Sequence, residues 1–221
     1  MIRAVIFDMF ETLITHYHSP LYFGSEIAKD AGIPEEKFQE LWHPAGSART
    51  VGRITLEELL TQILCANQRY SERLLKEIVD KRVSAKQECF RHLHPEIVPM
   101  LSCLKEKGIL IGLISNCFSE EVDVIRKSEL FSYFDAACLS YEQGVQKPDE
   151  EIYKRCTAAL SVTAEECLYV GDGGSFELEA ASKLGMTAVQ ALWYIKERMP
   201  VPKGSFPQAE RPLDILYYLD D

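Results

Sequence analysis

The sequence of 221 residues lacks features that mark several large classes of protein. Its seven cysteines form an odd set with no C-x-x-C pair, and several of them sit inside apolar runs. No apolar stretch approaches the roughly 18 residues of a membrane-spanning helix, and no charged-then-apolar leader precedes the first apolar run. We therefore expect reduced, buried cysteines in a cytoplasmic protein that has no membrane partner.

Basic residues are scarce relative to acidic ones. The chain carries 24 Lys and Arg against 34 Asp and Glu, which gives a net charge of -10. This balance argues against nucleic acid or an anionic membrane as the main binding partner, because both are polyanions. Any site for a phosphate group must therefore be local.

Apolar residues are abundant, at 47% of the chain, and their pattern predicts an α/β fold. From residue 94 onward, short apolar runs alternate with segments of helical period, which is typical of a parallel sheet built from βαβ units. The expected strands are 2–7, 110–114, 136–140, 167–170 and 187–190. The expected helices are 96–107, 119–127, 148–160 and 177–184, followed by a loop over 201–207 and a short helix over 213–219.

A helical insertion is expected between the first strand and the rest of the sheet. After Leu13 the apolar period becomes helical and stays so for about 75 residues. Thr55 and Glu58 have the spacing of a capping box before an apolar stripe. We predict a helical module at 15–90 and a core formed by 1–14 and 91–221.

Two aspartates mark the candidate site. Asp8 ends the first apolar run, and Asp172 follows the run at 167–170. In open α/β sheets ligands bind outside the carboxyl ends of the strands, so acids from two strands can share one hard cation there. Polar residues lie in comparable positions elsewhere: Thr12, Ser115, Asn116, Lys147 and Glu177.

These residues, in this order, resemble the four motifs of the haloacid dehalogenase superfamily: an aspartate nucleophile, a Ser or Thr, a Lys or Arg, and one or two acids. The resemblance covers essentially the whole chain and includes a helical cap inserted after the first motif, as in subfamily I. It implies a Rossmann-like three-layer core and a hydrolase, here most simply a phosphatase of a small phosphorylated metabolite. Monomer and homodimer both stay open.

The resemblance also implies a role for each residue. Asp8 would attack phosphorus and form an aspartyl-phosphate, which water then hydrolyses. Mg²⁺ would be held by Asp8, the backbone carbonyl of Phe10, Asp172 and Glu177, the last directly or through water. The phosphoryl group would be positioned by Thr12, Ser115 and Asn116, and Lys147 would balance its charge.

The pattern departs from the family phosphatases at Phe10. They usually carry a second aspartate there, which protonates the leaving group, and its loss typically costs about 10² to 10⁴ in rate. Glu11, His16 and His18 are candidate substitutes. An aromatic residue at this position is instead typical of the 2-haloacid dehalogenases, which attack carbon and give no proton to the leaving halide.

Two alternatives therefore remain open, a dehalogenase and a catalytically weak homologue that binds a metabolite or a protein. The dehalogenase would not require the acid at Asp172, and it would need an arginine for its substrate, for which Arg49 and Arg53 are candidates. Arg53, in the turn before the predicted capping box, is the better candidate for contact between the cap and the substrate.

Overall fold

A six-stranded sheet lies at the centre of the computed structural model, which describes residues 1–197 and 204–219. The strand order is β3-β2-β1-β4-β5-β6, and all neighbouring strands are parallel. The strands are β1 (Ala4–Phe7), β2 (Leu110–Ser115), β3 (Ala136–Leu139), β4 (Cys167–Gly171), β5 (Thr187–Ala191) and β6 (Gln208–Ala209). The predicted α/β class and parallel sheet are confirmed, and β6 is an addition. Of the loop predicted at 201–207, residues 201–203 lie outside the described residues.

Helices surround the sheet in the predicted order. The α-helices of this part are α6 (Ile97–Glu106), α7 (Ser119–Lys127), α8 (Ser140–Gln143), α9 (Glu150–Leu160) and α10 (Glu177–Lys183). Short 3-10 helices are η1 (Glu129–Tyr133), η2 (Ala164–Glu166), η3 (Ile195–Glu197) and η4 (Pro212–Tyr218). The helix predicted to start at Pro148 begins at Glu150, because Asp149 caps it by accepting a hydrogen bond from the Glu151 N–H at 2.9 Å.

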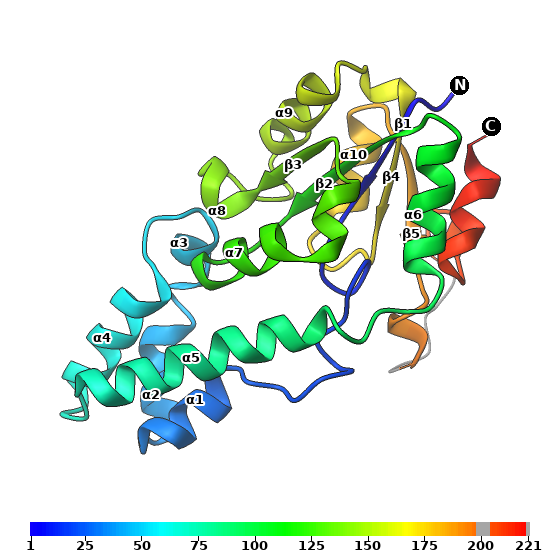
Figure 1. Ribbon diagram of the computed structural model, residues 1–221. Helices are drawn as coiled ribbons and strands as arrows, with labels where there is room; N and C mark the ends of the chain where they lie inside the picture. The colour runs from blue at the N-terminus through cyan, green and yellow to red at the C-terminus, as the bar shows by residue number, and fades with distance from the viewer. Residues whose placement is uncertain (198–203, 220–221) are drawn as a thin grey trace.

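Successive residues of each strand face opposite layers. In β1, Val5 and Phe7 belong to an apolar cluster with α6 and η4, whereas Ala4 and Ile6 belong to one with α9 and α10. All four residues are buried, which is typical of a central parallel strand covered on both faces. The result is the three-layer arrangement seen in Figure 1.

The segment between β1 and α6 is helical. Its helices are α1 (Gly24–Ala31), α2 (Glu35–Trp42), α3 (Gly46–Thr50), α4 (Leu56–Ala66) and α5 (Glu72–Cys89). They bury an apolar cluster of their own, which includes Phe38, Leu60 and Ile78. The predicted capping box is confirmed: Thr55 Oγ1 accepts from the Glu58 N–H at 3.1 Å, and a Glu58 carboxylate oxygen accepts from the Thr55 N–H at 2.8 Å.

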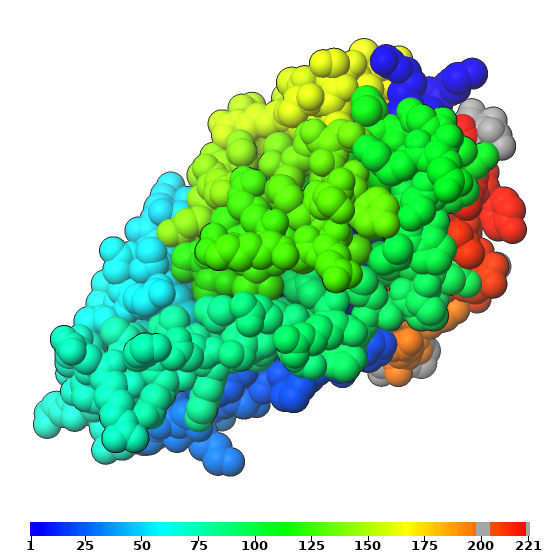
Figure 2. All heavy atoms as spheres, in the orientation of Figure 1, coloured from blue at the N-terminus to red at the C-terminus, as the bar shows by residue number. Residues whose placement is uncertain are grey.

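Helix α5 joins the two parts of the molecule. It runs from the helical segment toward the sheet and contacts α7 on the way (Figure 1). The space-filling view shows α1–α5 as one end of an elongated molecule (Figure 2). Within residues 1–197 and 204–219, no helix combines the length and apolar composition needed to cross a membrane.

Candidate active site

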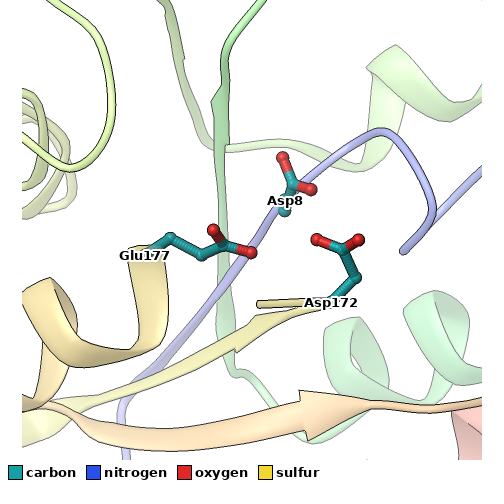
Figure 3. Close-up of side chains that lie close together, drawn as sticks. All are labelled: Asp8, Asp172 and Glu177. Carbon is teal, nitrogen blue, oxygen red and sulfur yellow. The ribbon is translucent and has the colours of Figure 1, made fainter. Parts of the chain in front are cut away.

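Three carboxylates converge at the carboxyl edge of the sheet. Asp8 follows β1, Asp172 follows the neighbouring β4, and Glu177 begins α10. One oxygen atom from each lies within 4.8 Å of the others. Figure 3 shows the three side chains directed toward a common space. The strand register explains this meeting: Phe7 pairs with Val170, so the residues that follow leave the sheet side by side.

The three carboxylates lie in a site with too little positive charge nearby to offset them. Burial, together with the neighbouring carboxylate of Glu177, raises the pKa of Asp8 to about 6 even though Lys147 opposes the rise. Burial and the carboxylates of Asp8 and Glu177 raise the pKa of Asp172 to about 8. Glu177 is the exception: burial acts to raise its pKa, but Lys147 and backbone N–H groups lower it below the usual value. The cluster therefore favours a bound proton or a cation.

The loop after β4 holds Glu177 with backbone groups. The N–H groups of Gly173 and Ser175 donate to the two oxygens of Glu177 at 2.8 and 2.6 Å. Gly173 has a φ of +95°, which side-chain-bearing residues rarely adopt. At Gly171 an added Cβ would lie 2.9 Å from a Glu177 oxygen. The glycines therefore give the loop its turn and leave space for the acid.

Lys147 is the cation at the centre of the site. Its buried Nζ lies 2.5 Å from Asp8 Oδ1 and 3.4 Å from the hydroxyl of Tyr169. Its backbone is held by the side chain of Asn116, whose Oδ1 accepts from the Lys147 N–H at 2.8 Å and whose Nδ2 donates to the Lys147 carbonyl at 3.0 Å. The Asn116 side chain, which the sequence predicts to bind phosphate, makes both of these bonds with the Lys147 backbone.

Two hydroxyls near the site have no hydrogen-bond partner within residues 1–197 and 204–219. They belong to Thr12 and Ser115, and both side chains are fully buried. Ser115 ends β2, the strand beside β1. Burying a hydroxyl without a partner costs roughly 1–3 kcal/mol. Such groups at the edge of a site are suited to receive a ligand atom.

The candidate substitutes for the missing acid have partners of their own. Glu11 accepts hydrogen bonds from Thr15 Oγ1 at 2.7 Å and from the His16 N–H at 3.1 Å. His16 stacks on Phe10 with 4.8 Å between ring centroids, and His18 Nε2 lies 2.7 Å from a Glu197 oxygen. Of the two histidines, His16 is therefore the one that contacts Phe10.

A second cluster of charges, which the sequence analysis did not predict, lies where the helical segment meets the core. Arg49 and two residues of α5, Arg82 and Lys86, are buried and form ion pairs with Glu120 and Glu121 of α7. These pairs join residues far apart in sequence. One local signal exists: residues 82 and 86 continue the spacing of the buried Ile78 along α5. Arg53, by contrast, lies in an exposed turn.

Comparison with known proteins places the chain in a family. A model described as haloacid dehalogenase-like hydrolase matches residues 2–185. The glyceraldehyde 3-phosphate phosphatase of Methanopyrus kandleri is 25% identical over 213 residues, covering 86% of this chain and 84% of its own. The (S)-2-haloacid dehalogenase 4A of Burkholderia cepacia is 24% identical over 197 residues, covering 86% and 82%.

Solved structures share the fold. A family enzyme from Bacteroides thetaiotaomicron, solved with magnesium and inorganic phosphate, gives a TM-score of 0.67 at 22% identity and covers 86% of this chain and 94% of its own. The 2-haloacid dehalogenase of Pseudomonas syringae pv. tomato gives 0.69 at 20% identity and covers 100% and 99%. With most of its length matched by the family model, this chain belongs to the haloacid dehalogenase-like hydrolases.

Proposed function

We propose that the protein hydrolyses small phosphate monoesters, using Mg²⁺ and an aspartyl-phosphate formed at Asp8. The observation that carries the proposal is the convergence of three carboxylates beside one lysine, with oxygens within 4.8 Å of one another. Lys147 cannot neutralise all three. A carboxylate can attack a phosphate ester, itself an anion, only where this charge is offset, so the arrangement favours a bound cation.

The residues fit a magnesium ion. Mg²⁺ prefers hard oxygen ligands, commonly one or two carboxylates together with water and substrate phosphate. Asp8, Asp172 and Glu177 supply carboxylate oxygens, and the backbone carbonyl of Phe10 is the fourth proposed ligand. When bound, the ion would offset negative charge on the nucleophile and on the phosphoryl oxygens. Among the residues that the structure describes, no sulfur or imidazole ligand belongs to the cluster of acids, which distinguishes it from a typical zinc site.

The chain's own residues would then act in sequence. Asp8 attacks phosphorus, and the P–O bond to the leaving group breaks, so that the leaving oxygen departs with the bonding electrons as a phenolate or, with a proton taken from water, as an alcohol. Lys147, already in contact with Asp8, would stabilise the negative charge on the phosphoryl oxygens. The hydroxyls of Thr12 and Ser115 would hydrogen-bond those oxygens and so gain the partners that they lack within the described chain. Asn116 keeps Lys147 in place throughout. Water then attacks the aspartyl-phosphate, releases phosphate and regenerates Asp8.

Two relatives support the choice of phosphate chemistry. The Methanopyrus kandleri protein is a glyceraldehyde 3-phosphate phosphatase, and the Bacteroides thetaiotaomicron enzyme was solved with magnesium and inorganic phosphate. Neither fixes the substrate of this chain.

We propose that residues 15–90 are a cap, and that 1–14 and 91–221 form the catalytic core. Helices α1–α5 bury their own apolar cluster, which supports their treatment as one unit. The cap meets the core mainly through the contact of α5 with α7 and through the charges at that junction. A cap in this position would exclude water while Asp8 reacts.

A second candidate function is the hydrolysis of a 2-haloacid. Phe10, in place of the usual acid, favours it, as does the similarity to the Burkholderia cepacia dehalogenase. The cluster of carboxylates opposes it, because the charges of Asp172 and Glu177 would repel a carboxylate substrate unless a cation lay between them. A catalytically weak homologue is the third alternative, and its main support is again Phe10.

One panel separates these functions. Aryl phosphates, alkyl phosphates and 2-haloacids would be assayed with Mg²⁺ and with chelator, using wild type and Asp8→Asn. We expect phosphate release that requires both Mg²⁺ and Asp8. Halide release that persists in chelator would establish the dehalogenase instead. If neither product forms, the binding homologue is favoured.

A further inference from the structure

A cavity of about 360 Å³ lies between the helical segment and the core, beside the proposed phosphate site. Phe10 and Asn116, which line it, lie next to or near Asp8 and Ser115 in the sequence. Arg49, Arg82 and Lys86 of the helical segment also line it. Its volume is at the lower end of the range for small-ligand sites, so it suits a leaving group of a few atoms.

Arg49 is held rigidly in the wall of this cavity. Its Nη2 donates to Glu120 Oε1 at 2.8 Å, and its guanidinium carbon lies 4.1 Å from the ring centroid of Trp42 and 4.0 Å from that of Phe118. The side chain is 3% exposed. Two stacked rings and an ion pair fix the plane of the guanidinium before any ligand arrives.

Within the described residues, Nη2 is the Arg49 side-chain nitrogen that makes a hydrogen bond. Arg49 Nε is buried and makes no hydrogen bond within residues 1–197 and 204–219. The neighbouring cations are engaged: Arg82 Nε donates to Glu120 Oε1 at 3.2 Å, and Lys86 Nζ lies 2.6 Å from both Glu121 Oε1 and His16 Nε2. A buried donor without a partner on a charged group is costly, so its presence beside a cavity points to a ligand.

The five charged residues of this cluster carry three positive and two negative charges. Arg49, Arg82 and Lys86 are set against two carboxylates, Glu120 and Glu121. His16 adds no charge near pH 7, because burial and the nearby Lys86 ammonium hold its pKa below the usual 6.5. The surplus matches a single negative charge, in a chain whose net charge is -10.

We propose that this cavity binds a carboxylate on the leaving group of the phosphate ester, with the guanidinium of Arg49 as the principal donor. The inference rests on the proposed phosphatase function and names its substrate class: small phosphorylated carboxylic acids. A second phosphate on the leaving group, with close to two negative charges, matches the surplus charge less well. An uncharged leaving group would leave Arg49 Nε without a partner.

The test compares two esters on the same three-carbon frame. In 3-phosphoglycerate a carboxylate occupies the position of a CH₂OH group in glycerol 3-phosphate. We expect the wild type to prefer 3-phosphoglycerate in kcat/KM by roughly 10- to 100-fold, the range for a hydrogen bond to a charged group. Arg49→Met should remove most of this preference, whereas Arg73→Met, which removes an exposed arginine of the same segment, should keep it.

Other outcomes would overturn the proposal. Equal kcat/KM for the two esters in the wild type would do so, as would loss of the preference in Arg53→Met but not in Arg49→Met. A stronger preference for glycerol 1,3-bisphosphate would assign the cavity to phosphate instead. If Arg49→Met does not fold, as judged by circular dichroism, Arg49→Lys decides: it keeps the charge but lacks the planar guanidinium, and an undiminished preference would contradict the proposed role of that guanidinium.

A failure of the phosphatase proposal can be distinguished from a failure of this one. If neither ester is hydrolysed, titration calorimetry of Asp8→Asn with each ester still measures binding. Tighter binding of 3-phosphoglycerate, lost when Arg49→Met is added, would support the carboxylate site without catalysis. Equal binding of the two esters would refute it.

Discussion

Of the three carboxylates in the proposed metal site, Asp172 has the most strongly raised pKa. Without a cation, its charge is held beside those of Asp8 and Glu177 in a partly buried site, which raises its pKa to about 8. Asn has nearly the same shape and no charge. We therefore predict that Asp172→Asn stabilises the metal-free protein at alkaline pH and abolishes its stabilisation by Mg²⁺.

The direction in which the unfolding free energy changes with pH follows from the raised pKa of Asp172. The folded state retains a proton at Asp172 over a pH range in which the unfolded chain, with a pKa near 3.8, has lost it. This contribution to stability is complete below the unfolded pKa and is lost as pH rises toward 8. Asp8, with a pKa raised to about 6, adds a smaller loss that is complete at lower pH. The metal-free wild type should therefore lose stability relative to Asp172→Asn as pH rises from 5 to 8.

The change in unfolding free energy caused by Asp172→Asn has an upper limit. A rise from 3.8 to about 8 is about four pH units, and at 1.36 kcal/mol per unit it corresponds to at most about 6 kcal/mol. Water reaches the partly exposed Asp172, and the site can share its proton between carboxylates, so we expect about 2–3 kcal/mol at pH 8. For a chain of this length that is roughly 4–12 °C in melting temperature.

Urea denaturation provides the assay. The free energy of unfolding would be measured from pH 5 to 8 in chelator, and again in Mg²⁺, for wild type and Asp172→Asn. Subtracting the unfolding free energy of one protein from that of the other cancels the contribution of groups that titrate in both. Asp80→Asn, on the exposed face of α5, is the matched control and should behave as wild type in both series. Mg²⁺ at ten times its Kd should stabilise the wild type by about 1.4 kcal/mol and the variant not at all.

Two results would contradict the prediction for Asp172→Asn. The first is a difference in unfolding free energy between wild type and Asp172→Asn that stays constant from pH 5 to 8. The second is equal stabilisation of both proteins by Mg²⁺, which would remove Asp172 from the metal site.

Three further predictions concern the groups around Asp8. Ser115→Ala should lower kcat/KM for phosphate esters by about 10-fold or more while costing little stability, because the hydroxyl has no partner within the described residues; a loss of stability without a loss of rate would contradict its role. Asn116→Ala should cost about 1–3 kcal/mol in urea denaturation and also lower kcat, because it removes both bonds that hold the Lys147 backbone; unchanged kcat would show that Lys147 does not need them. The wild type should hydrolyse aryl phosphates far faster than uncharged alkyl phosphates, and Phe10→Asp should raise alkyl turnover about 10-fold; equal wild-type rates would mean that another residue already supplies the proton.

Local patterns in the sequence were sufficient to predict strands β1–β5 and the proximity of Asp8 and Asp172. Apolar runs predicted β1 and β4, and the geometry of parallel strands then predicted that Asp8 and Asp172 would lie at one edge. The strand β6 was not predicted, since two residues, Gln208 and Ala209, carry no apolar run.

Pairings between distant elements could not be predicted in the same way. Asn116 was assigned to phosphate because it follows Ser115, but its side chain bonds to Lys147, 31 residues away. Arg53 was predicted to contact the substrate because of its position in a turn, and that turn is exposed, whereas Arg49 is buried against α7. Which of two nearby arginines is buried depends on the packing of helices, and the local sequence does not determine it.

The proposed phosphatase reaction requires that Asp8 becomes phosphorylated during turnover. Borohydride reduces an acyl phosphate to an alcohol, so quenching the enzyme during turnover of an aryl phosphate should convert Asp8 into homoserine, which peptide mass spectrometry identifies. We predict this conversion at Asp8 in the presence of Mg²⁺ and its loss in chelator. Steady turnover with Asp8 unmodified, or with the modification on another residue, would contradict the account.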